Sequence, residues 1–74
     1  MREKFYKILE NILEITIDKS QNLVIKDCKE WTSLAYIDII MSLEDEFEIK
    51  FAREDIFYFK TTEELLQYIK NKVG

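Results

Sequence analysis

Three stretches of the chain carry apolar residues at helical spacing. Apolar side chains recur every three or four positions in residues 2–14, 33–48 and 62–72, which places them on one face of an amphipathic helix. In chain order they are Phe5, Ile8, Leu9, Ile12 and Leu13, then Tyr36, Ile39, Ile40, Leu43 and Phe47, then Leu65, Leu66, Tyr68 and Ile69. We therefore expect three helices. The last opens with Thr61 as N-cap and Glu64 three positions on, which is the capping-box pattern.

The remaining segments lack a helical period. Residues 53–59 predict a short third helix anchored by Ile56, Phe57 and Phe59, and a strand is the alternative because aromatic residues favour strands. Residues 15–32 predict an ordered crossover whose apolar run Leu23-Val24-Ile25 packs onto the helices. The chain has no proline and a single, terminal glycine, which suits a mostly helical protein. The fold predicted is all-α: a small four-helix bundle with a long loop between helices one and two, in one domain spanning residues 1–74.

In the helix predicted over residues 33–48, apolar residues also occur outside the main buried face. Leu34, Ile37 and Met41 fall at the border of its buried face, beside acidic positions. Two interpretations remain open from the pattern alone. The helix either buries a wide apolar stripe, or exposes a surface that mixes Leu and Met with carboxylates.

Acidic charge is concentrated in the middle of the chain. The net charge of the protein is −4; residues 38–55 hold seven acids and two bases, a charge of −5, and the remainder carries +1. Nucleic acid and anionic membranes are disfavoured partners because a polyanion is repelled. A basic protein surface is attracted.

The residue inventory excludes most catalytic chemistry. Histidine is absent, and there is one cysteine and one glycine. Serine–histidine catalysis, zinc constellations and glycine-rich phosphate loops therefore have no basis here. No disulfide is possible, and no apolar run approaches the ~20 residues of a membrane span. The first residues carry no apolar signal region, so the sequence predicts a cytoplasmic protein that binds no membrane. It also predicts a non-enzymatic module that works with partners.

An ordered set of short motifs carries a family resemblance. The set begins with Ser33-Leu34 and continues with residues 37–47, which end in Leu43-Glu44-Asp45-Glu46-Phe47. Ile49-x-Phe51 and then residues 61–69, which start Thr61-Thr62-Glu63-Glu64, complete it. Together they resemble an acyl carrier protein, and with residues 2–14 as the first helix the resemblance covers nearly the whole chain.

The resemblance implies a specific prosthetic group. In this family the serine that begins the second helix carries 4′-phosphopantetheine through a phosphodiester, and the matching residue is Ser33. Coenzyme A is the donor, and a separate Mg²⁺-dependent phosphopantetheinyl transferase forms the bond. The arm holds acyl groups as thioesters for fatty-acid, polyketide or other specialised biosynthesis, so the protein is expected to be a monomeric carrier rather than a catalyst. Acyl-loading and acyl-processing enzymes with basic patches are the expected partners. Their docking residues would be Leu34, Asp38, Met41, Glu44, Asp45 and Glu48.

Two alternatives and three departures accompany the resemblance. From local sequence alone Ser33 is a plain N-cap, a role that Thr32 can take instead, and the unmodified chain would be an acidic helical protein-interaction module. The family usually has aspartate before the serine, where this chain has Thr32, and Arg53 stands in a region commonly acidic. The long loop with Cys28 and Trp31 differs from the family's usual glycine-containing approach to the serine. Together these departures suggest a carrier of a specialised pathway.

Overall fold

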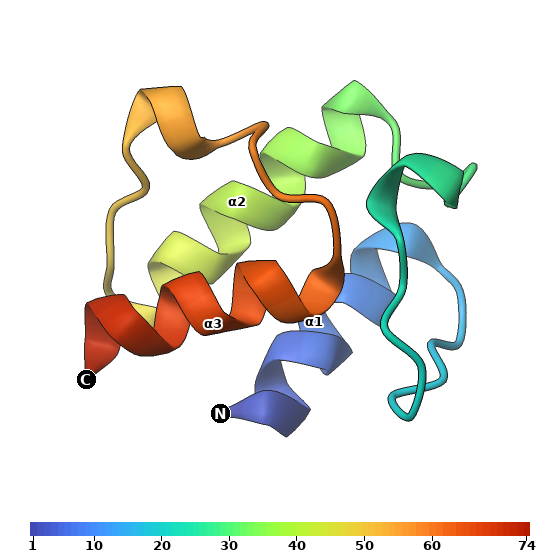
Figure 1. Ribbon diagram of the computed structural model, residues 1–74, viewed down its shortest axis with the longest axis horizontal. Helices are drawn as coiled ribbons and strands as arrows, with labels where there is room; N and C mark the ends of the chain where they lie inside the picture. Colours follow the sequence, from blue (N-terminus) through green and yellow to red (C-terminus); the bar gives the residue numbers. More distant parts are fainter.

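The protein is built from three α-helices joined by two long connections. The computed structural model describes residues 1–74, and the elements are α1 (Arg2–Leu13), η1 (Ile25–Asp27), α2 (Ser33–Phe47), η2 (Arg53–Asp55) and α3 (Thr62–Val73), where η marks a single 3₁₀ turn (Figure 1). The all-α class and the three periodic helices are confirmed, with bounds within one residue of those predicted. None of the helices is long and apolar enough to cross a membrane.

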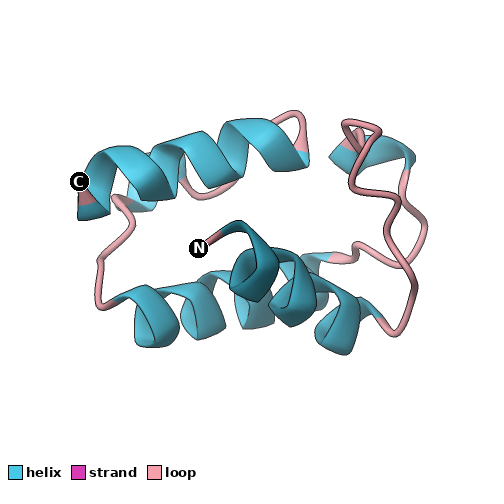
Figure 2. Cartoon of the chain, turned by 90° about the horizontal axis from the view of Figure 1, so that it is seen from below, coloured by secondary structure: helices cyan, strands magenta, loops and turns pink.

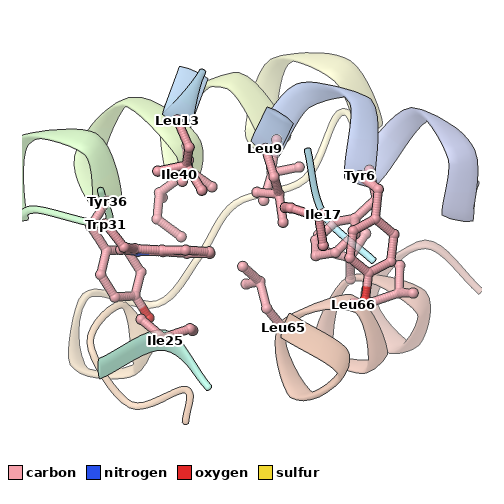
Figure 3. Packing of buried hydrophobic residues seen from close by; sticks show 14 of the residues in the cluster. Tyr6, Leu9, Leu13, Ile17, Ile25, Trp31, Tyr36, Ile40, Leu65 and Leu66 are labelled. Atoms are coloured by element: carbon pink, nitrogen blue, oxygen red, sulfur yellow. The ribbon is translucent and has the colours of Figure 1, made fainter. Parts of the chain in front are cut away.

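The predicted apolar faces meet in one core. Figure 2 shows α3 lying over a layer formed by the other two helices. Each helix contributes side chains with no exposed surface, among them Leu9 from α1, Leu43 from α2 and Ile69 from α3. Figure 3 shows the packing of this cluster. Phe47 and Tyr68, both assigned to buried faces, are only half-buried because they lie at the edge of it.

The segment before α2 is an ordered, apolar-anchored crossover, as predicted. Ile17, Ile25 and Trp31 are buried in the core. Backbone hydrogen bonds tie this segment to the approach of α3: the amide of Ile25 donates to the carbonyl of Lys60 at 2.9 Å. The amide of Thr62 donates in turn to the carbonyl of Leu23 at 3.0 Å. These bonds hold the two connections side by side, at the single antiparallel bridge of the structure.

The predicted short third helix is replaced by one 3₁₀ turn. Only Arg53–Asp55 is helical, and a turn follows it. The four-helix arrangement is therefore not confirmed, and the alternative strand does not form either. Long-range aromatic contacts, rather than helical periodicity within the segment, hold these residues in place. Phe57 contacts Tyr36 on α2, whereas Phe59 packs against Phe51 and Tyr68. Phe57, predicted as an anchor, is 64% exposed.

A polar link joins α1 to the start of α3. The buried hydroxyl of Tyr6 hydrogen-bonds the Glu63 carboxylate and lies 3.1 Å from the hydroxyl of Thr62, which is itself fully buried. The Arg2 guanidinium pairs with Glu63 at 2.8 Å. The hydrogen bond from Arg2 is the main cause that lowers the pKa of Glu63, and the hydrogen bond from Tyr6 is the second. Burial raises the pKa of Tyr6.

The capping box of α3 forms with one change of partner. The Thr61 hydroxyl accepts from the amide of Glu64 at 3.3 Å, as the pattern predicts. The Glu64 carboxylate accepts from the amide of Lys60 at 2.7 Å, one residue earlier than a capping box requires. The first turn of α3 is therefore fixed to the loop before it.

Candidate functional site

Ser33 is the first residue of α2, and its hydroxyl is free. The N-cap is Thr32, whose hydroxyl accepts from the amide of Ala35 at 3.1 Å. Ser33 is exposed, and its hydroxyl makes no hydrogen bond with the chain, so the plain-cap interpretation of Ser33 is wrong. The amides of Ser33 and Leu34 have no partner within the helix, as expected at a helix start. Free amides and the helix dipole together stabilise an anion at this position.

An aromatic cluster packs against the core side of the start of α2. Trp31 and Tyr36 are buried and make an edge-to-face contact with ring centroids 5.5 Å apart. Tyr36 makes a second such contact, at 5.0 Å, with the exposed ring of Phe57. Burial raises the pKa of Tyr36 to about 12, so its hydroxyl is protonated at neutral pH. Ser33 therefore begins a helix whose first turn is packed against buried aromatic side chains.

The outer side of α2 is an exposed surface of mixed character. Leu34 is 78% exposed and Met41 is 62% exposed, and Asp38 lies exposed between them. This spacing continues to Asp45 and Glu48, which are also exposed, so the five residues form one stripe along the helix. We call this stripe the outer face of α2. The border residues Leu34, Ile37 and Met41 are therefore part of an exposed mixed surface, and not of a wide buried apolar stripe.

The C-terminal half of the outer face opens into a groove. The groove has a volume of about 870 Å³ and runs between the end of α1, the second half of α2 and the loop after it. Its lining residues are Ile12, Asp38, Met41, Ser42, Glu44, Asp45, Glu48, Ile49 and Lys50. The structure thus brings five of the six predicted docking residues together, while Leu34 lies beyond the groove, beside Ser33.

Glu44 differs from the other acids of the groove because it has a structural role. Its carboxylate accepts from the amide of Phe51 at 2.8 Å, and its carbonyl accepts from the amide of Ile49 at 3.2 Å. Glu48 ends the helix in the left-handed conformation with φ of 53°. These contacts turn the chain sharply after α2, and they leave Asp38, Asp45 and Glu48 as the more available charges.

Four lining residues were not predicted as part of a site, and one of them, Ser42, lies on α2 among the predicted docking residues. The other three come from outside α2. Ile12 was assigned to the buried face of the first helix, and Ile49 and Lys50 to the connection after the second. No local pattern indicates them, because their proximity depends on how α1 packs beside α2. Lys50 places a base within an otherwise acidic lining.

Comparisons with known proteins agree with this geometry. Residues 31–69, more than half of the chain, match the family model described as a phosphopantetheine attachment site. An acyl carrier protein of Buchnera aphidicola subsp. Schizaphis graminum (strain Sg) is 33% identical over 73 residues, covering 97% of this chain and 92% of that protein. The matched region begins at Trp31, and so contains Ser33 and the outer face of α2.

Proposed function

The chain belongs to the acyl carrier protein family, and from that premise we propose that Ser33 is the attachment point of its 4′-phosphopantetheine. Proteins of this family are carriers and not catalysts, and they work with phosphopantetheinyl transferases and acyl-processing enzymes. The observation that carries the assignment is the free, exposed hydroxyl of Ser33 at the start of α2. Because Thr32 caps the helix, modification of Ser33 would leave the cap in place.

The residues present fit the prosthetic group. In the attachment reaction the Ser33 oxygen would attack the β-phosphorus of coenzyme A, the phosphoanhydride bond would break, and adenosine 3′,5′-bisphosphate would leave. The serine proton would pass to a base of the transferase. The phosphodiester formed carries one negative charge, which the free amides at the start of α2 would stabilise. The bound arm supplies a thiol that holds acyl or related groups as thioesters.

The outer face of α2 is the proposed docking surface. Asp38, Asp45 and Glu48 present exposed negative charge that would attract basic patches on partner enzymes and speed association. Leu34 and Met41 add small apolar contacts, and the flexible Met side chain adapts to several partners. We assign Glu44 a secondary part, because its carboxylate is already bonded to the backbone. Monomeric state and cytoplasmic location stay predictions from the sequence.

The cargo pathway is proposed from two departures of the sequence. Thr32 caps the helix without adding a charge beside Ser33, and Arg53 is an exposed base. Both reduce negative charge around the acidic surface, which favours partners other than those of the housekeeping fatty-acid pathway. Efficient loading and elongation by fatty-acid synthase enzymes would contradict this part of the proposal.

Intact mass spectrometry tests the attachment. The purified protein is incubated with coenzyme A, Mg²⁺ and a permissive transferase, and we expect a gain of one phosphopantetheine. Ser33→Ala abolishes the gain, whereas Ser42→Ala, on the same helix, retains it. An unmodified interaction module predicts no gain with several transferases, and an equal gain in Ser33→Ala would place the arm elsewhere.

Association kinetics test the docking surface. We expect Asp45→Lys to slow association with the transferase and to weaken its dependence on salt, because one exposed charge of the steering field is inverted. Glu3→Lys makes the same charge change on α1, outside the groove, and is the matched control. Equal slowing by both variants would show that net charge alone, and not the outer face of α2, governs association.

A further inference from the structure

A cleft separate from the groove beside α2 lies between α3 and the connection that precedes it. Its volume is about 400 Å³, near the lower end of the roughly 300–1,000 Å³ that is common for ligand pockets. It shares no lining residue with the groove. Its walls carry three aromatic residues, Tyr58, Phe59 and Tyr68, and two acids, Asp55 and Glu64. No base lines it, so the cleft combines aromatic surface with negative charge, and we call it the aromatic cleft.

The two carboxylates of the cleft are held in place, and neither is neutralised by a base. The Tyr68 hydroxyl donates to Oδ2 of Asp55 at 3.3 Å, and the amide of Lys60 donates to Oε1 of Glu64 at 2.7 Å. The second oxygen of each carboxylate makes no hydrogen bond within the chain. Neither acid forms an ion pair, since both ion pairs of the protein involve other residues. The cleft therefore presents two oriented acceptors that carry charge and have no cation.

Tyr58 adds an aromatic ring that has no partner within the chain. Its side chain is 77% exposed and takes part in none of the ring–ring contacts of the structure. Phe59 and Tyr68, by contrast, contact each other with ring centroids 5.1 Å apart. The ammonium of Lys72 lies 5.4 Å from the centroid of the Tyr68 ring, so a cation is already drawn to an aromatic face here. The unpartnered ring and the unpaired carboxylates together point to a second cation, supplied from outside the chain.

A guanidinium group fits this lining better than other cations do. It is planar, stacks on aromatic faces and directs several N–H donors towards carboxylates, whereas a lysine ammonium is a compact and strongly hydrated charge. A divalent metal needs a shell of oxygen ligands, and the protein has no group of three acidic, histidine or cysteine residues that could hold one. Gln67 and Asn71 complete the lining. The Nε2 of Gln67 donates to Oδ1 of Asn71 at 3.2 Å, so the Gln67 carbonyl oxygen remains as a further acceptor.

We propose that the aromatic cleft binds the side chain of an arginine presented by a partner protein. The guanidinium stacks on the ring of Tyr58 and donates to the free oxygens of Asp55 and Glu64. The arginines of the chain itself do not fill this role, because Arg2 is already in an ion pair and Arg53 does not line the cleft. The cleft is thus a second recognition surface beside the outer face of α2, and it selects partners by one arginine. The proposal goes beyond attachment at Ser33 and does not depend on it.

Titration with short blocked peptides tests the cleft directly. The unmodified, nitrogen-15-labelled protein is titrated with acetyl-glycyl-arginyl-glycine amide, and nuclear magnetic resonance spectra are recorded. Two further peptides replace the arginine, one with citrulline, which keeps the planar group and loses the charge, and one with lysine, which keeps the charge and loses the planar group. We expect the arginine peptide to shift the side-chain amide resonances of Gln67 and Asn71, which line the cleft, and to saturate in the millimolar range. The citrulline and lysine peptides should bind several-fold more weakly.

Matched variants separate the cleft from general effects of charge and apolar surface. Asp55→Asn keeps an acceptor for the Tyr68 hydroxyl and removes the charge, and it should weaken binding of the arginine peptide about three- to tenfold. Glu54→Gln removes a neighbouring exposed charge that does not line the cleft, and it should leave the affinity unchanged. Tyr58→Ala should weaken binding, whereas Phe57→Ala, which removes a 64% exposed ring outside the cleft, should not. The Tyr58 side chain is largely exposed, so its removal leaves the fold intact.

Three results would overturn the inference. Equal affinity for the arginine and citrulline peptides, or for the arginine and lysine peptides, would mean that the cleft does not recognise guanidinium. Equal weakening by Asp55→Asn and Glu54→Gln would mean that net charge alone attracts the peptide. Shifts confined to α2, with the Gln67 and Asn71 resonances unchanged, would place the arginine on the outer face of α2. Failure of attachment at Ser33 is a different result, because intact mass measures it separately and these titrations use the unmodified chain.

Discussion

Removing the hydroxyl of Tyr6 tests how α1 and α3 are held together. In Tyr6→Phe the ring still fills its place in the core, while the hydrogen bonds to Thr62 and Glu63 are lost. Tyrosine has one proton, so when Tyr6 donates it to the Glu63 carboxylate, the Thr62 hydroxyl must donate to the Tyr6 oxygen. The substitution therefore strands the hydroxyl of Thr62, which has no exposed surface.

The size of the stability loss depends on whether water can replace the hydrogen bonds that Thr62 and Glu63 lose. A buried hydroxyl left unpaired costs about 1–3 kcal/mol. The Glu63 side chain is 36% exposed and keeps Arg2, so water replaces much of what its carboxylate loses. We therefore expect a loss of about 2 kcal/mol, mostly from Thr62. For 74 residues the whole unfolding free energy is about 4–11 kcal/mol, so this loss is a large fraction of it.

Urea denaturation measures the effect. The midpoint should fall with an unchanged slope, and the Tm should fall by about 8–16 °C. Tyr58→Phe, which removes an exposed hydroxyl, should stay within about 0.5 kcal/mol of the unaltered chain. Adding Thr62→Val to Tyr6→Phe removes the stranded hydroxyl and should recover about 1 kcal/mol or more. A loss below about 0.5 kcal/mol in Tyr6→Phe, or no recovery in the double variant, would refute the reasoning.

Three further predictions concern the cap and the titrating groups. Thr32→Ala should cost about 0.5–2 kcal/mol in urea denaturation, because the cap is lost, while the mass gain at Ser33 persists. Glu63 has a folded pKa below its unfolded value, so its contribution to stability is present above about pH 4.3 and is lost as pH falls through the folded pKa. Glu63→Gln should flatten that acid slope in a series of urea midpoints. Tyr36 has a folded pKa of about 12 against about 10 unfolded, so its contribution is present below pH 10 and is lost towards pH 12. It amounts to about 2–3 kcal/mol, and Tyr36→Phe should lose correspondingly less stability over that range.

Each of the three has an outcome that contradicts it. Loss of the mass gain in Thr32→Ala would mean that the cap is needed to present Ser33 to the transferase. An acid slope unchanged by Glu63→Gln would assign the acid sensitivity to other carboxylates. An alkaline slope unchanged by Tyr36→Phe would assign it to Tyr6, whose pKa is also raised by burial.

Helices were predictable because their signal is local. The faces built from Leu9, Leu43 and Ile69 repeat at helical spacing within single segments, and each is buried as that spacing predicts. The segment over residues 53–59 was wrongly assigned, because its conformation is decided by distant partners. Phe57 contacts Tyr36 on α2 and Phe59 contacts Tyr68 on α3, and no pattern within the segment indicates where those helices lie.

The same division holds for the site. The outer face of α2 follows from residues on one helix, so Asp38, Met41 and Asp45 could be placed together from their spacing alone. The groove could not, because Ile12 arrives from α1 and joins it only in the packed structure. The sequence also could not indicate that the Nε1 of Trp31 and the hydroxyl of Tyr36 are buried without a hydrogen-bond partner, because burial depends on the packed structure.

The link between Tyr6 and Thr62 also bears on how the protein is made. These residues are separated by 56 positions, so the first helix leaves the ribosome long before its partner exists. At a synthesis rate of about 5–20 residues per second, a nascent chain spends seconds with Tyr6 unable to complete its hydrogen bonds. The native core closes only after α3 has emerged from the ribosome. The proposed attachment of the arm to Ser33 would thereby be reserved for chains in which α3 has already been synthesised.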